Sequence, residues 1–302
     1  MILLVGASGS LGGMIVRKLL DEGFDTRVLW RSAVRSDRSL NQPASSSLEG
    51  LIEAGARPVY GDLRDSATLM KACRGADIVI TTASAAFRGR EDTVEAVDHL
   101  GNRNLIDAAR GNGVGRFIFV SNYFSNPASP LPILSAKALT EQYLQASGLP
   151  YVILAPTGFM ESWLIPLLAR PAIERRQAIL IGRGSRPHSL ISMQDVANFA
   201  VSALHKIEAV NKKVPLGGPF AFTMEEALGM YESVMGEKIA RRYVHAGEIL
   251  PDLPQDAWSF TMFLDLVSSE IDMTEIARLY KVSLTPLEAF VRRSLSGEMR
   301  TH

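Results

Sequence analysis

The stretch Gly6-Ala7-Ser8-Gly9-Ser10-Leu11-Gly12 directly follows the apolar run Ile2-Leu3-Leu4-Val5 and leads into an amphipathic segment that continues to Glu22. A β-branched run, a glycine cluster and a helical repeat predict a strand, a tight turn and a helix in succession. Glycines let a ligand approach the backbone, and N–H groups at a helix N-terminus bind phosphate. We therefore predict that a dinucleotide pyrophosphate contacts Gly6, Ser8, Gly9, Ser10, Leu11 and Gly12. The alternative is an ordinary tight turn between a strand and a helix.

Short β-branched runs alternate with amphipathic helical stretches as far as Ala155, which is typical of βαβ units. The predicted strands are Ile2–Val5, Thr26–Leu29, Arg57–Tyr60, Ile78–Thr81, Phe117–Val120 and Tyr151–Leu154. The predicted helices are Leu11–Glu22, Ser47–Ala54, Ser66–Cys73, Asp92–Asn112 and Ser135–Ser147. Right-handed crossovers place these strands in an α/β fold with a doubly wound parallel (Rossmann) sheet, which binds ligands at the carboxyl ends of its strands.

Helices dominate beyond Pro156, where short strands are predicted only at 179–181, 190–192 and 239–244. We expect residues 1–156 to form the dinucleotide-binding domain and residues 157–302 to form a smaller, mostly helical C-terminal substrate lobe. We leave open that part of this lobe packs back onto the sheet. The segment Thr223-Met224-Glu225-Glu226 has the pattern of a capping box and predicts the start of a helix.

Basic and acidic residues balance at 32 each in a chain of 302, so nucleic acid and anionic membrane surfaces are not expected as partners. The expected ligand is a small molecule. No apolar run approaches the roughly 20 residues that span a bilayer, and the N-terminus lacks the basic segment of a secretory signal. We therefore expect a soluble, cytoplasmic protein without membrane insertion. The five histidines lack metal-ligand spacing, so we predict no metal.

Arg31 stands at the end of the second predicted strand, in Leu29-Trp30-Arg31-Ser32. Sites for NAD carry an acidic residue about 20 residues after the glycine turn, where it binds the ribose 2′-hydroxyl. No acid occurs in this window. An arginine can instead bind a 2′-phosphate and stack on adenine, and Ser32 and Arg35 are close enough in sequence to contribute. We therefore predict NADP(H) as the cofactor, the alternative being that Arg31 is a solvated loop residue.

Several segments, by their order and spacing, resemble the atypical short-chain dehydrogenases of the NmrA-like and isoflavone-reductase-like group. They are the glycine turn, Arg31, Gly61-Asp62-Leu63, Asn102–Ala109, Phe117–Ser121, Lys137 with Glu141, Ser147–Tyr151, Pro156–Met160, Ser192–Ala197 and Pro286–Phe290. The resemblance implies that Asp62 and Leu63 border the adenine ring and that Thr82, Ala83 and Ser84 line the ribose and pyrophosphate. Both segments also follow predicted strands, at the end where such sheets bind ligands. For Asp62 the alternative is an N-cap or turn acid before Ser66.

The position of Lys137 raises the question of catalysis. Short-chain dehydrogenases typically use a Tyr-x-x-x-Lys pair whose tyrosine protonates the substrate oxygen, but the tyrosine position here is Ile133, which cannot transfer a proton. In the isoflavone-reductase-like branch, a lysine here is thought to donate the proton alone or to orient the nicotinamide, so the resemblance implies either role for Lys137. The alternative is an exposed helix residue paired with Glu141.

The other candidate site residues follow the fifth and sixth predicted strands. Ser121, Asn122 and Tyr123 are expected to face the nicotinamide, and the Tyr123 hydroxyl could replace the missing tyrosine, although an aromatic residue there more often forms a pocket wall. Pro156 and Phe159 are expected beside the cofactor. The predicted substrate pocket is apolar and consists of Tyr123, Phe159, Met160 and Trp163; the alternative is that this spacing marks hydrophobic core.

Two functions remain open. The first is an NADPH-dependent reductase that transfers hydride to a small apolar or aromatic carbonyl, quinone or conjugated double bond, with Lys137 and Tyr123 as candidate catalytic groups. The second is a non-catalytic NADPH-sensing regulatory or assembly protein, which would act on a protein partner. The resemblance includes regulatory members without established turnover, and Ile133 fits them.

Overall fold

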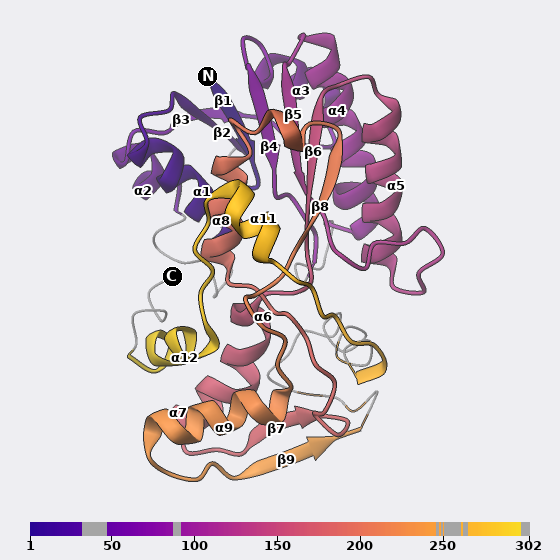
Figure 1. Cartoon of the computed structure of the whole chain (residues 1–302). Coiled ribbons are helices and arrows are strands. Elements are labelled where there is room, and N and C mark those ends of the chain that lie inside the picture. The colour runs from indigo at the N-terminus through magenta and orange to yellow at the C-terminus, as the bar shows by residue number, and fades with distance from the viewer. Residues whose placement is uncertain are drawn as a thin grey trace. The chain divides into compact units, whose positions relative to one another are not determined.

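The computed structural model describes residues 1–31, 47–86, 92–245, 248, 250, 261 and 265–296 (Figure 1). The chain divides into two compact units. The first contains Met1–Ala155 with Val196–Val214, and the second contains Pro156–Asp195 with the described residues from Pro215 onward.

A seven-stranded sheet with the order β3-β2-β1-β4-β5-β6-β8 organises the first unit. Its strands are β1 (Ile2–Val5), β2 (Thr26–Trp30), β3 (Arg57–Tyr60), β4 (Ile78–Thr81), β5 (Arg116–Val120), β6 (Tyr151–Pro156) and β8 (Lys212–Leu216). The first six pair in parallel. The strand β8 also runs parallel, because Asn211 N donates to Tyr151 O where β6 begins and Thr157 N donates to Leu216 O where β6 ends. The strand order reverses beside β1, so the predicted doubly wound α/β fold is confirmed.

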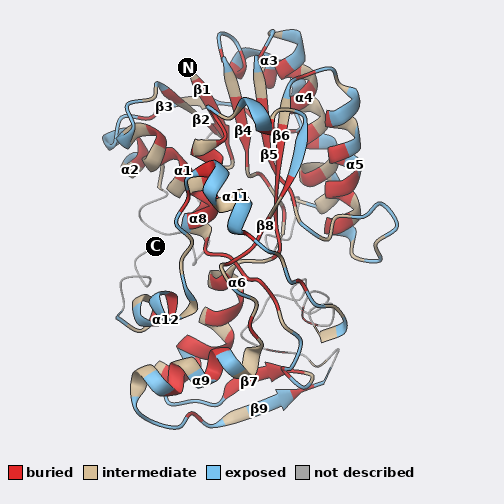
Figure 2. Ribbon diagram, viewed as in Figure 1, coloured by how far each residue is buried: buried red, intermediate tan, exposed pale blue. Residues whose placement is uncertain are grey.

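Helices cover this sheet on the faces that its alternating side chains define. They are α1 (Ser10–Asp21), α2 (Leu48–Glu53), α3 (Ser66–Ala72), η2 (Glu95–Gly101), α4 (Asn102–Gly111), α5 (Pro132–Ala146), η4 (Ile207–Ala209) and most of α8 (Met193–Ser202). Leu3 and Val5 share a buried cluster with Leu69 of α3, Leu105 of α4 and Leu144 of α5, so these three helices lie on one face. Figure 2 shows the central strands β1, β4, β5 and β6 mostly buried and the outer surfaces of these helices exposed.

The predicted helix over Asp92–Asn112 is not uniform. It begins as the π-helix η2 and continues as α4, with the change at Gly101. A Cβ atom on Gly101 would lie 2.8 Å from Ala96 O and 2.9 Å from Leu63 Cβ, so this close approach requires glycine. Single π-helical turns inside helices are often found at functional sites.

The second unit has its own buried cluster, which includes Trp163, Leu180, Leu228, Tyr231 and Phe290. Its elements are α6 (Met160–Leu164), the π-helix η3 (Ile165–Ala169), α7 (Arg170–Ile173), β7 (Ala178–Ile181), α9 (Met224–Met235), β9 (Arg241–Val244), α11 (Thr274–Tyr280) and α12 (Leu287–Ser296). The strands β7 and β9 pair in parallel. The predicted capping box is confirmed, since Thr223 Oγ1 accepts from Glu226 N and the Glu226 carboxylate accepts from Thr223 N.

Two strand assignments change. The strand predicted over 190–192 is wrong, because Ile191 makes only an isolated bridge to Phe159 and Ser192 accepts hydrogen bonds from Asp195 N where α8 starts. The strand β8 was not predicted, because its short sequence begins with Lys212-Lys213 and contains Pro215. Proline is tolerated in a strand at the edge of a sheet, which is where β8 lies.

Candidate functional site

The predicted glycine turn links β1 to α1. Gly6 has a φ of +95°, and a Cβ atom there would lie 2.6 Å from Thr82 Oγ1. A Cβ atom on Gly12 would lie only 2.1 Å from Gly6 O, so no larger residue fits without moving backbone. The N-terminus of α1 has no side-chain cap and no acidic residue in its first turn. Its N–H groups are therefore arranged to accept an anion.

The residues predicted for the adenosine end form two ion pairs. Arg31 Nη1 lies 2.8 Å from Asp92 Oδ1, and Asp62 pairs with Arg64. The hydrogen bond from Arg64 is the largest cause that lowers the pKa of Asp62, and Arg31 lowers it further. Arg31 is therefore near the carboxylates of Asp62 and Asp92. Asp92 was not connected with Arg31 in the sequence analysis. The predicted contributors Ser32 and Arg35 lie outside the described residues.

Asp62 and Leu63 follow β3 as predicted. Asp62 accepts a hydrogen bond from Arg64 N, which makes it a turn acid, whereas the N-cap of α3 is Asp65. The Leu63 side chain is buried in the hydrophobic cluster of the first unit. A role of either residue at an adenine ring stays a prediction.

The loop after β4 lies against the glycine turn. Thr82 N donates to Val5 O at 2.9 Å, and the Thr82 side chain lies directly beside Gly6. Ser84 Oγ accepts from Ala86 N, and Ala83 is buried. The structure therefore brings the predicted residues Thr82 and Ala83 beside the turn that would hold the pyrophosphate, while a role of Ser84 there stays a prediction.

Lys137 of α5 is buried, with 8% of its surface exposed. Its Nζ donates to Val120 O at 3.2 Å, lies 3.6 Å from Asp98 Oδ1 and lies 5.3 Å from the centre of the Phe119 ring. The alternative that Lys137 is an exposed partner of Glu141 is wrong. The ammonium group instead lies at the carboxyl end of β5, the edge at which such sheets bind ligands.

Glu141 has different partners. Its Oε1 accepts from the hydroxyls of Ser121 and Ser125, and its Oε2 lies 2.9 Å from Lys213 Nζ. Glu141 and Ser121 are buried. The predicted site residue Ser121 is therefore held by a carboxylate that Lys213 of β8 neutralises.

Asn122 and Tyr123 follow Ser121 on the same loop. Asn122 Oδ1 accepts from Phe124 N at 2.9 Å, which fixes the turn. Tyr123 is 38% exposed, and its ring packs edge-on against Phe124. Both residues lie directly beyond the carboxyl end of β5, while contact with a ligand stays a prediction.

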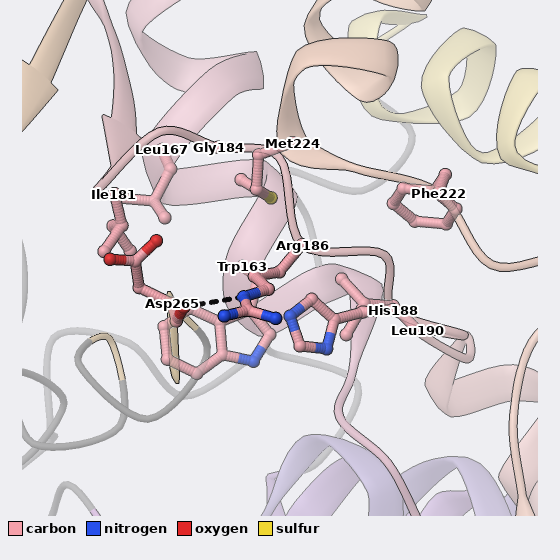
Figure 3. A pocket seen from close by; sticks show the side chains of 10 residues that line it. All are labelled: Trp163, Leu167, Ile181, Gly184, Arg186, His188, Leu190, Phe222, Met224 and Asp265. Atoms are coloured by element: carbon pink, nitrogen blue, oxygen red, sulfur yellow. Dashed lines mark hydrogen bonds between the residues drawn. The ribbon is translucent and has the colours of Figure 1, made fainter. Parts of the chain in front are cut away.

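The predicted pocket residues Phe159, Met160 and Trp163 belong to the second unit. Phe159 precedes α6, and Met160 and Trp163 are buried on that helix. Trp163 lines a narrow pocket (Figure 3) whose other lining residues are Leu167, Ile181, Gly184, Arg186, His188, Leu190, Phe222, Met224 and Asp265. Met160 does not line it and packs in the core instead. Pro156, predicted beside the cofactor, is the last residue of β6.

Polar groups enter this apolar pocket from the segment with Arg186 and His188 and from Asp265. Arg186 Nε donates to Asp265 O at 3.2 Å, and His188 Nδ1 lies 3.1 Å from Ser269 Oγ. Figure 3 shows both side chains among the apolar lining residues. The pocket therefore combines an aromatic and aliphatic wall with groups that can bind an oxygen of a ligand.

Sequence reasoning missed Asp98, Asp92 and Lys213. Each has its partner 39 or more residues away, as in Asp98 with Lys137 or Arg31 with Asp92. The one local signal for Asp98 is its spacing of four residues from Asn102, which places both on one side of a helix. Arg186 and His188 were also missed, because they precede the strand predicted over 190–192 and no local pattern marks them.

The described part of the chain contains no helix that is both long and apolar enough to cross a membrane. Within the same residues, no three or more His, Cys, Asp or Glu side chains form a cluster that could hold a metal ion.

Known proteins resemble this chain over most of its length. The photosystem II assembly factor Ycf39 of Cyanophora paradoxa is 29% identical over 98% of this chain and 92% of its own, and phenylcoumaran benzylic ether reductase 1 of Arabidopsis thaliana is 25% identical over 88% and 84%. Among solved structures, Citrobacter sp. triphenylmethane reductase complexed with NADP(H) is 17% identical with a TM-score of 0.78 over 98% and 100%. The NADPH-dependent quinone oxidoreductase of Escherichia coli, complexed with NADPH, is 21% identical with a TM-score of 0.76 over 97% and 99%.

The two solved structures share the fold. The model of the NmrA-like family matches residues 1–289, which covers both units and agrees with the resemblance carried by the glycine turn and the later segments. The chain belongs to the NmrA-like family.

Proposed function

We propose that this chain is an NADPH-dependent reductase that transfers hydride to a small apolar or aromatic carbonyl, quinone or conjugated double bond. The observation that carries the proposal is the position of Lys137, whose buried ammonium group lies at the carboxyl end of β5. Ile133 stands where short-chain dehydrogenases have their proton-donating tyrosine, and a solvent-exposed lysine could not take over that role. The buried lysine supplies a proton donor in the unit that carries the glycine turn.

The residues around the glycine turn fit a dinucleotide. Gly6 and Gly12 have no room for a Cβ atom, so the turn stays tight, and the uncapped start of α1 favours negative charge. Arg31 supplies a guanidinium for a 2′-phosphate. When bound, the nicotinamide would supply the hydride. Reductases named for NADPH or NADP(H) among the solved structures of this fold support the same choice of cofactor.

The remaining chemistry belongs to side chains of this protein. Lys137 would protonate the oxygen that gains charge as hydride arrives, or hold the nicotinamide ribose. The pocket at Trp163 and Phe222 lies within the second unit, where its apolar wall together with Arg186 and His188 would suit an apolar ligand that carries an oxygen.

The direct test is oxidation of NADPH, followed at 340 nm, across a panel of quinones, enones and aldehydes. We expect turnover with at least one member and saturable NADPH binding in its absence. Saturable binding of NADPH without oxidation across the whole panel would contradict the reductase.

The Lys137→Met variant should lose about 10²- to 10⁴-fold in kcat, the usual effect of removing a general acid. Its affinity for NADPH should change much less, because the glycine turn is untouched. Stopped-flow turnover and fluorescence titration of NADPH measure the two quantities separately. Lys18→Met on α1, a partly exposed lysine paired with Glu22, serves as the control with unchanged kcat. Equal losses in binding and turnover would assign Lys137 to cofactor binding alone.

The Arg31→Ala variant should bind NADPH about ten- to a hundredfold more weakly, because hydrogen bonds to charged groups contribute roughly 1.5–3 kcal/mol. Its affinity for NADH should stay the same. The matched variant Asp92→Asn removes the competing carboxylate from Arg31 and should strengthen NADPH binding by up to about fivefold, the range of an exposed ion pair. Isothermal titration with both nucleotides checks these values, and a parallel loss for NADPH and NADH in Arg31→Ala would rule out a 2′-phosphate contact.

A second function is favoured by Ile133 and by the assembly factors among the relatives. In that case the chain senses NADPH and captures a protein partner without turnover. Absence of oxidation together with partner capture that changes when NADPH is added would favour it. Partner capture that is the same with and without NADP(H) would remove the sensing role.

A further inference from the structure

We propose that Asp98 is a positioning residue for Lys137, holding its ammonium group at the end of β5 and connecting it to the loop after β4. The inference rests on the proposed function, in which Lys137 acts on the substrate or the nicotinamide ribose. It concerns a residue of η2 that no motif in the sequence marked.

The carboxylate of Asp98 is shared between two segments. Its Oδ2 accepts from Ala85 N at 2.8 Å. Its Oδ1 has no hydrogen-bond partner and lies 3.6 Å from Lys137 Nζ. Asp98 itself is 0% exposed. One oxygen therefore holds the loop predicted to line the cofactor, while the other is left for the ammonium group.

The backbone around Asp98 is fixed by buried polar contacts. Thr140 Oγ1 of α5 donates to Asp98 O at 2.7 Å, and Asn102 Nδ2 donates to Val97 O at 2.9 Å. Asn102 Oδ1 in turn accepts from Thr81 at the end of β4. Asp98 lies on the π-helix η2, in contact with the loop after β4 and with α5. Such turns are frequently found at functional sites.

Other charged groups on the elements around Lys137 have different partners. On η2, Glu95 pairs with His99. On α4, Arg103 stacks on the Tyr143 ring and Asp107 accepts from the Tyr143 hydroxyl. On α5 and β8, Glu141 pairs with Lys213. Among the residues that the structure describes, Asp98 is the carboxylate that the ion pairs assign to Lys137.

Burial and charge act in opposite directions on this pair. Burial raises the pKa of Asp98, and the Lys137 ammonium group lowers it. A buried cation that loses its counter-charge gives up its proton more easily. Asp98→Asn retains the size of the side chain and an acceptor for Ala85 N but removes the charge. It should therefore make Lys137 lose its proton at lower pH.

The test measures that proton directly. Acetic anhydride labels neutral amines, and peptide mass spectrometry reports the labelling of Lys137 as a function of pH, without any need for turnover. In Asp98→Asn the labelling midpoint should move at least one pH unit lower, and the alkaline limb of the kcat profile should move with it. Asp98→Glu should restore both toward wild type. A midpoint unchanged in Asp98→Asn overturns the assignment.

Two controls separate charge from packing. Thr140→Val removes a buried hydrogen bond to Asp98 without changing charge, and it should leave the labelling midpoint of Lys137 in place.

If Asp98→Asn alone does not fold, Lys137→Met and the double variant Lys137→Met/Asp98→Asn are compared by urea denaturation. Removing both charges should raise the urea midpoint above that of Lys137→Met, because a single buried charge is left unpaired only in the latter. A urea midpoint of the double variant below that of Lys137→Met would overturn the proposed pairing of Asp98 with Lys137. If the labelling midpoint shifts but the protein oxidises no NADPH, the proposed reductase activity is contradicted, whereas the pairing of Asp98 with Lys137 is supported.

Discussion

The Gly12→Ala variant is expected to lose NADPH binding by more than about a hundredfold and to unfold more easily by roughly 1–3 kcal/mol, the usual range for overpacked sites. The added Cβ atom would lie 2.1 Å from Gly6 O and 3.0 Å from Ala7 Cα. Both are backbone atoms, so no side-chain rotation relieves the contact. The start of α1 must move away from the turn, and the N–H groups that would bind the pyrophosphate move with it.

Gly229→Ala is the matched control, because Gly229 lies inside α9 and a Cβ atom there meets nothing within 4 Å. It should stabilise the protein by up to about 1 kcal/mol through helix propensity and leave NADPH binding unchanged. Urea denaturation and fluorescence titration of NADPH measure both effects. Wild-type affinity in Gly12→Ala would show that the turn does not hold the dinucleotide.

Much of the first unit could be predicted from its sequence because its signals are local. Each of its first six strands is a short apolar run followed by glycine or polar residues, and each was placed within two residues of its observed bounds. Hydrophobic periodicity and turn residues are enough for such segments. The glycine turn is the clearest case, since steric limits at Gly6 and Gly12 leave glycine as the residue that fits.

The second half was harder because its signals depend on tertiary contacts. β8 includes two lysines and a proline, and it becomes a strand only because β6 offers an edge. The run Leu190-Ile191-Ser192 has the composition of a strand, but Ser192 directly precedes α8 and accepts from Asp195 N, which leaves Ile191 with a single bridge. In both places the neighbouring segments decide the local structure.

In the candidate site, too, local signals could be predicted from the sequence and tertiary contacts could not. Lys137 was identified from its position in the sequence, but its burial and its partner Asp98 depend on how η2 packs against α5. Local spacing favoured Glu141 as its partner, and the structure pairs Glu141 with Lys213 instead. Charges on different elements cannot be matched from one sequence, because only the packing of the elements decides which of them meet.

Glu161 in the second unit gives the other large effect. Both oxygens of its carboxylate accept from Met193 N at 3.0 Å, where α8 begins. Burial is the main cause that raises the pKa of Glu161 to about 7, and the nearby Asp195 raises it further while Arg293 opposes the shift. The native protein therefore binds this proton more tightly than the unfolded chain, in which the pKa is about 4.3.

The sign of the pH effect follows from that difference. Where the folded state binds more protons than the unfolded state, the free energy of unfolding falls as pH rises. For Glu161 the contribution is fully present below pH 4.3 and is lost as the pH rises to about 7. At about 1.4 kcal/mol per unit, the loss over the whole range amounts to at most roughly 4 kcal/mol.

Glu161→Gln removes this titration while retaining an acceptor for Met193 N. The difference in free energy of unfolding between the variant and the wild type should therefore grow by roughly 2–3 kcal/mol in favour of the variant between pH 4.5 and pH 7.5. Urea denaturation at several pH values measures it, and other titrating groups cancel in the difference. Glu275→Gln, on an exposed side chain paired with Arg278, should show no such pH dependence. A constant difference for Glu161→Gln would mean that its carboxyl group is already ionised near pH 5, because the hydrogen bonds from Met193 and the charge of Arg293 would then outweigh its burial.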